Sequence, residues 1–209
     1  MADLALLRID LNIVGLIARN SSMYSEFAND EHRAQAEELL LELGRFAVAF
    51  ERVCEGMRDA IMLILQSDGL RHQGLARVVI GDKTSAELQV LLGALISELR
   101  ARTDELDQKA IHALLKEVKE LTEARNVVIH SAWSFGQNAA FAELYATAIR
   151  PRTKQNRGAV PEIHGMSAQY LRQLTETSNA LQIRLQRLQN CIIGDDLKVA
   201  TELSRAVEA

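Results

Sequence analysis

Apolar residues recur at intervals of three or four along most of this chain, which is the period of amphipathic α-helices. The longest such run follows Asn29 and Asp30, whose side chains are suited to cap a helix N-terminus. Its apolar positions are Leu39, Leu43, Phe46, Phe50, Val53, Met57, Ile61 and Ile64. The pattern predicts a long helix with one buried face, which bends or packs closely at Gly44 and Gly56.

A shorter run near the start predicts a helix over residues 3–18 that closes over the core. Its apolar stripe consists of Leu6, Ile9, Ile13 and Ile17. After the long helix, residues 69–82 contain three glycines and are predicted to be a turn-rich connection. Thr84, Ser85 and Glu87 then form a capping-box pattern, which predicts a third helix ending near Arg100.

A fourth helix is expected to begin at Thr103 or Asp104. Its core stripe consists of Ile111, Leu114, Leu115, Val118, Leu121, Val128 and Ile129. Arg125 falls on this stripe, four residues after Leu121 and three before Val128. A guanidinium at an apolar position needs a buried partner, a cleft or a subunit interface, so Arg125 is a candidate functional residue.

The helical period fails between Ser134 and Gly165, where both prolines lie. Residues 141–149 fit a short strand or a weak helix, and we expect a small irregular or β-hairpin insert around residues 136–166. Ser167 is then placed to cap a last long helix that ends by Gly194, with a tail helix over residues 195–207. The stripe of the last long helix is Leu171, Leu174, Ser178, Leu181, Leu185 and Leu188.

The composition agrees with an all-α fold, a helical bundle of about five helices. The 209 residues include 4% aromatic residues and two prolines, and Leu, Ala and Glu are abundant. A chain of this length fits one domain. We predict a single domain, residues 1–209, with its bundle core at about 30–135 and 167–193. The net charge of −4 means that the protein as a whole does not attract polyanions.

The sequence gives no indication of disulfide bonds, a membrane-spanning segment or a common cofactor-binding motif. Cys54 and Cys191 are far apart and are read as buried small hydrophobic residues in a reducing compartment. Residues 4–17 are interrupted by polar side chains and are too short to cross a bilayer, so a cytoplasmic location without membrane contact is expected. Phosphate-binding, dinucleotide-binding and zinc-protease motifs are missing from the sequence, and no metal or cofactor is expected.

The densest chemistry lies at Arg125, Asn126 and His130. Asn126 and His130 are four residues apart, so on a helix the amide can orient the imidazole. Arg125 and His130 are five apart, about 140° around the helix axis. A straight helix is not expected to aim both at one small target. We therefore expect either a frayed helix end near His130 or a second subunit that completes the site.

The spacing R-N-x-x-x-H resembles the signature of the HEPN superfamily, whose members are compact helical bundles with this motif near the end of a late helix. Many catalytic members are metal-independent ribonucleases, often toxins, and they commonly form homodimers. The resemblance implies that His130 acts as general base or acid on the ribose 2′-hydroxyl or the leaving oxygen. It implies that Arg125 holds the phosphate and that Asn126 orients the imidazole or contacts phosphate.

The resemblance also bears on partners. It implies RNA as a substrate and a cognate antitoxin or other protein as a partner. Toxins in some HEPN/nucleotidyltransferase pairs carry a tyrosine two residues after the histidine, where the partner modifies them. The residue here is Ala132, so regulation by that route is not expected.

Two other interpretations of the motif stay open. Arg125 and His130 can be cations that cap free carbonyls and favour the negative end of a helix dipole. The chain can also be a non-catalytic HEPN-like interaction or scaffold protein. A weaker candidate for RNA contact is a run of four cations within eight residues, which is also typical of a solvated loop tip. These cations are Arg150, Arg152, Lys154 and Arg157.

Overall fold

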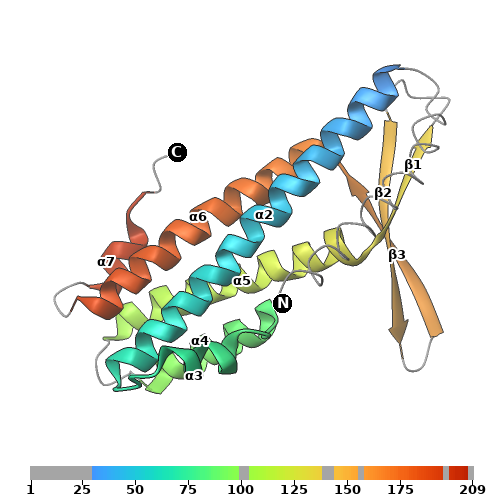
Figure 1. Cartoon of the computed structure of the whole chain (residues 1–209). Helices are drawn as coiled ribbons and strands as arrows, with labels where there is room; N and C mark the ends of the chain where they lie inside the picture. Colours follow the sequence, from blue (N-terminus) through green and yellow to red (C-terminus); the bar gives the residue numbers. More distant parts are fainter. Residues whose placement is uncertain (1–29, 99–103, 138–143, 155–157, 195–197, 207–209) are drawn as a thin grey trace, which may run out of the picture.

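The computed structural model describes residues 30–98, 104–137, 144–154, 158–194 and 198–206. Within these ranges the chain forms six helices and one three-stranded sheet. The helices pack side by side as a bundle, and the sheet stands at one end of it (Figure 1). The predicted all-α class with a small strand insert is confirmed. The helix expected over residues 3–18 lies outside the described residues.

Helix α2 (Asp30–Ser67) is the longest element of the bundle and forms much of its core. Phe46, Val53, Met57 and Ile61 are all completely shielded from solvent, as the apolar period predicted. Gly56 is a point of close packing, because a Cβ atom there would lie 3.2 Å from Leu185 Cδ1. Gly44 makes no such approach, since a Cβ atom there would meet nothing within 4 Å.

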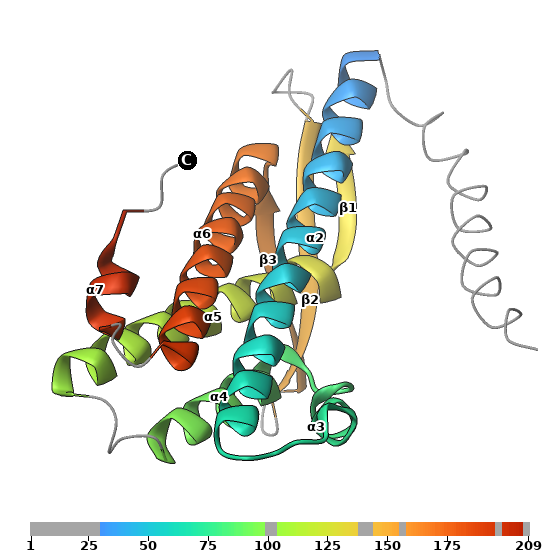
Figure 2. The same ribbon diagram turned by 60° about the vertical axis from the view of Figure 1, so that its left-hand side comes forward.

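The main partner of α2 is α6 (Ala168–Ile193), and the two helices run parallel. Near the start of both helices, Arg172 pairs with Glu38 and with the buried carboxylate of Glu42. Further along, Gln189 Nε2 donates to the Gly56 carbonyl at 2.9 Å. Ser167 begins α6 as predicted, because its side chain accepts a hydrogen bond from the Tyr170 N–H. Figures 1 and 2 show the two helices side by side in both views.

Residues 69–82 are more ordered than the glycines suggested. They contain helix α3 (Gln73–Ile80), so the prediction of a simple turn-rich connection is wrong. Ala76 and Ile80 are four residues apart and both buried, and this contact with the core stabilises the short helix. Only Gly69 has the positive φ of a turn glycine, at 98°.

Helix α4 (Ser85–Glu98) begins with the predicted capping box. The Thr84 N–H donates to Glu87 Oε2 at 2.8 Å, and the Glu87 N–H donates to Thr84 Oγ1 at 3.4 Å. The Thr84 N–H and the Thr84 hydroxyl both donate to the Glu87 carboxylate, and these two hydrogen bonds hold its pKa below the usual value. Leu88 and Leu92 then face the core.

Helix α5 (Glu105–His130) has Asp104 as its N-cap, one of the two predicted starts, and runs antiparallel to α6. The buried Asp107 in its first turn accepts a hydrogen bond from the Ala200 N–H at 2.8 Å. That bond fixes the start of α7 (Val199–Ser204), which is shorter than the predicted tail helix. The far end of α5 leads directly into the sheet.

The insert is a three-stranded antiparallel sheet of β1 (Ala132–Gln137), β2 (Leu144–Lys154) and β3 (Gly158–Met166). It therefore begins at Ala132 rather than near residue 136, and it has one strand more than the expected hairpin. Ala146 and Met166 are buried and join the bundle core. The sheet thus packs on the end of the helices while linking α5 to α6.

Candidate functional site

The candidate site lies in the last two turns of α5, next to the sheet. Val128 and Leu121 are buried and hold this part of the helix against the core. Arg125 and Asn126 are half-buried, and His130 is exposed as the last residue of the helix. All three polar side chains therefore belong to a helix end that is fixed on one face and open to solvent on the other.

Arg125 finds its partner on α2. Its guanidinium carbon lies 5.5 Å from the centroid of the Phe50 ring, in a cation–π contact. Phe50 is itself buried and meets Phe46 edge to face, with ring centroids 6.3 Å apart. The aromatic face accommodates a guanidinium at a position that the apolar pattern reserves for hydrophobic side chains.

Arg125 and His130 converge on one point. Arg125 Nη1 lies 2.8 Å from His130 Nε2. The expectation that one straight helix cannot bring these groups together is wrong, and α5 remains helical through His130. The Arg125 side chain is long enough to extend along the helix surface past its own turn, so the angle between positions 125 and 130 does not keep the two groups apart.

Asn126 does not orient the imidazole, which was one of the two roles expected for it. The structure shows no hydrogen bond between Asn126 and His130, both of which it describes. Instead, Arg125 Nη1 donates to Asn126 Oδ1 at 3.4 Å. The amide thus contacts the guanidinium rather than orienting the imidazole, and a single nitrogen of Arg125 contacts both neighbours.

The contact of Arg125 with the imidazole has a defined direction. A guanidinium can only donate, so in this hydrogen bond Arg125 Nη1 is the donor and His130 Nε2 is the acceptor. The hydrogen bonds of Arg125 with described residues use Nη1 alone. The other two guanidinium nitrogens keep their N–H donors available for an anion.

Trp133 secures the end of the helix. Its indole Nε1 donates to the Val128 carbonyl at 2.8 Å, and its ring lies against Phe135 with centroids 6.4 Å apart. Among the described residues, neither Arg125 nor His130 donates to a carbonyl of α5. The carbonyl of Val128 near the end of α5 is therefore capped by Trp133, not by Arg125 or His130.

Cys54 lies close to the site on α2 but is not a reactive group. Burial, with a smaller contribution from Glu51, raises the pKa of its thiol to about 11, although the nearby Arg125 acts in the opposite direction. The thiol is therefore protonated at neutral pH and is a weak nucleophile. Cys54 serves as a small buried side chain, as the sequence predicted.

The basic run is partly outside the described residues. Arg150, Arg152 and Lys154 belong to β2, where the backbone register places their Cα atoms opposite those of Glu162, Val160 and Gly158 of β3. Arg157 lies outside the described residues. Ile149 pairs with Ala132, so Arg150 follows the point where β2 passes the end of α5. The backbone of β2 from Arg150 onward thus starts next to the end of α5.

Phe50 is a site residue that the sequence pattern did not reveal. Its spacing on α2 marks it only as a core position, and no local pattern links it to a residue 75 positions later. The only indication in the sequence that Arg125 has a partner was its position, a charged residue on an otherwise apolar stripe.

No protein-family model, curated protein or solved structure matches this chain. Within the described ranges, no group of three or more His, Cys, Asp and Glu residues is placed to hold a metal ion. In that same part of the chain, no helix is both long and apolar enough to span a bilayer.

Proposed function

We propose that this chain is a metal-independent endoribonuclease of HEPN type. The observation that supports it is the 2.8 Å approach of Arg125 Nη1 to His130 Nε2 at an exposed helix end. A cation with free donors next to an imidazole provides the groups needed to bind a phosphodiester and move a proton.

The reaction follows from these groups. His130 Nε2 removes the proton of a ribose 2′-hydroxyl, and the 2′-oxygen attacks the adjacent phosphorus. The bond to the 5′-oxygen breaks, leaving a 2′,3′-cyclic phosphate and a 5′-hydroxyl. Arg125 turns from the imidazole to the phosphate and stabilises the charge that develops on its oxygens. This exchange frees the Nε2 lone pair when substrate binds.

A dimer would supply the missing acid. The 5′-oxygen needs a proton as it leaves, and one copy of the site presents a single imidazole at the end of α5. A second copy across a two-fold axis would bring another His130. We expect sedimentation at micromolar concentration to give a species of about twice the 23.2 kDa of one chain. A species of 23.2 kDa alone would contradict a shared site.

The cleavage test uses purified protein and labelled RNA in EDTA. We expect fragments that end in a 2′,3′-cyclic phosphate. The same sequence with 2′-O-methyl groups should stay intact, because it lacks the attacking hydroxyl. Cleavage that requires an added divalent metal, or that proceeds equally on the 2′-O-methyl substrate, would contradict the mechanism.

Replacing Arg125 by alanine should lower the cleavage rate by roughly 10²-fold, since a donor to the developing charge is lost. Arg125→Lys keeps the positive charge but not the planar fork, so it should recover part of this loss. Single-turnover cleavage rates of the two variants, measured at saturating RNA, check this order. Equal rates for alanine and lysine would show that charge at residue 125 plays no part.

A toxin function within a toxin–antitoxin or defence system fits this proposal, with an antitoxin as partner. The genes on either side of the coding sequence offer a direct check. A small neighbouring gene for a nucleotidyltransferase or another antitoxin would favour it.

The second candidate is a non-catalytic helical interaction protein. It is favoured by large apolar side chains that α3 and α4 leave exposed, among them Val78 at 80% and Val90 at 72%. Such side chains are common at surfaces that bind other proteins. RNA that stays intact in the EDTA assay, together with a stable complex with another protein, would favour this candidate.

A further inference from the structure

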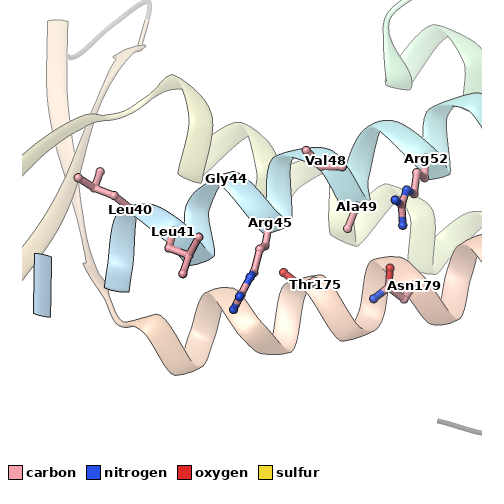
Figure 3. Close-up of a pocket in the computed structure, with 9 residues that line it drawn as sticks. All are labelled: Leu40, Leu41, Gly44, Arg45, Val48, Ala49, Arg52, Thr175 and Asn179. Carbon is pink, nitrogen blue, oxygen red and sulfur yellow. The ribbon is translucent and has the colours of Figure 1, made fainter. Parts of the chain in front are cut away.

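A shallow groove of about 610 Å³ runs between α2 and α6, away from the Arg125 site. Leu40, Leu41, Gly44, Arg45, Val48, Ala49, Arg52, Thr175 and Asn179 line it. Figure 3 shows that Arg45 and Arg52 both extend from α2 toward α6. The groove combines apolar side chains with two cations.

Two large apolar side chains of the groove are exposed to solvent. Leu41 and Val48 are seven residues apart on α2 and are 54% and 59% exposed. Gly44 lies between them with no atom within 4 Å of the place where a Cβ would be. A glycine within a helix destabilises it relative to alanine. No described residue occupies the space next to Gly44. A second helix packed against α2 at this point would occupy it.

The charges of the groove have the same spacing. Arg45 and Arg52 are also seven residues apart, so they lie on one face of α2, next to the two apolar side chains. Arg45 pairs with Glu42 at 2.7 Å and stays 57% exposed. Arg52 is exposed and forms no ion pair with any residue that the structure describes. The groove therefore suits an amphipathic helix with carboxylates seven residues apart.

The chain itself contains such a segment. The helix predicted over residues 3–18 carries Asp3 and Asp10, seven residues apart, and its stripe carries Leu6 and Ile13 at the same interval. In the antiparallel direction the order of types matches that of α2. In that alignment Ile13 would face Leu41, Asp10 would face Arg45, Leu6 would face Val48 and Asp3 would face Arg52.

The connection allows this arrangement. Leu41 is 11 residues beyond Asp30, or roughly 16 Å along α2. The 12 residues from 18 to 29 span up to about 40 Å when extended. An antiparallel helix that precedes α2 therefore needs only a short return to reach the groove.

We infer that residues 3–17 bind the α2–α6 groove of their own chain as an antiparallel helix, with Asp10 and Asp3 next to Arg45 and Arg52. In this arrangement Leu6 covers Val48 and Ile13 covers Leu41, and the helix formed by residues 3–17 packs closely over Gly44. This inference is independent of the proposed ribonuclease function.

Hydrogen–deuterium exchange of the full chain tests the inference. The amides of residues 3–17 should exchange at least tenfold more slowly than those of a free peptide of the same sequence. The double variant Arg45→Glu, Arg52→Glu should remove this protection, and so should Asp3→Arg, Asp10→Arg. Combining all four substitutions should restore it, because the charges are then exchanged across the groove.

A matched control is Lys109→Glu, Lys116→Glu, which reverses two exposed cations seven residues apart on α5 and should leave the protection unchanged. Gly44→Leu gives a second test that does not alter charge. Its side chain has open space in the described structure but blocks a docked helix, so protection of residues 3–17 should fall at least tenfold.

Three results would overturn the inference. The first is exchange of residues 3–17 at free-peptide rates in the unaltered chain. The second is a fourfold variant that stays unprotected. The third is protection that increases with protein concentration, because the groove would then hold the segment of a second copy.

Discussion

Replacement of His130 by alanine is expected to lower the rate of RNA cleavage by roughly 10²–10⁴-fold, the usual contribution of a positioned general acid or base. The change removes Nε2, the atom that lies 2.8 Å from Arg125 Nη1. Because His130 is exposed, the free energy of unfolding should change by only about 0.5 kcal/mol or less. Cleavage in EDTA and a denaturant titration measure the two quantities.

The matched control is His112→Ala, which removes an exposed histidine from the same helix, away from the site. It should leave the cleavage rate unchanged. If the alanine variants at 112 and 130 cleave RNA as fast as the unaltered protein, the observed cleavage comes from another source. The ribonuclease proposal would then fail.

Phe46→Ala should lower the free energy of unfolding by about 3–5 kcal/mol, because it leaves a cavity in the core. Phe46 is 0% exposed, and its ring meets Phe50 edge to face. For a chain of this length each kcal/mol lowers Tm by about 2–4 °C. Thermal and urea unfolding should therefore both show a large loss.

Phe46→Leu is the control, since it keeps most of the apolar volume and should lose clearly less stability. A similar loss for leucine and alanine would mean that the aromatic contact with Phe50, rather than the filled space, is what matters at this position. A loss below about 1 kcal/mol for alanine would contradict a packed core around α2.

The sequence predicted the helices where local chemistry determines their limits. Thr84 with Glu87 and Ser167 with the Tyr170 N–H are interactions between residues three positions apart, so their pattern is visible in the chain. The same is true of the apolar stripe of α2. Helix α3 was missed because its stability depends on burying Ala76 and Ile80, a packing against other helices that the local pattern does not show.

The candidate site was predictable only in part. The position of Arg125 on an apolar stripe indicated that a partner was needed, yet Phe50 could not be identified because the contact joins two helices far apart in the chain. The convergence of Arg125 and His130 depends on the extended reach of one side chain. Helix geometry describes the directions of Cβ atoms and says little about the ends of long side chains.

The parallel pairing of α2 with α6 determines when the protein can fold. The bond from Gln189 to Gly56 joins residues 133 positions apart, and α6 is made after every other large element. At a synthesis rate of about 5–20 residues per second, several seconds pass between the synthesis of α2 and that of α6, and the apolar face of α2 has no α6 to pack against during this time. A ribosome that stalls before Ala168 would therefore release a chain with an open core, a ready substrate for chaperones and proteases.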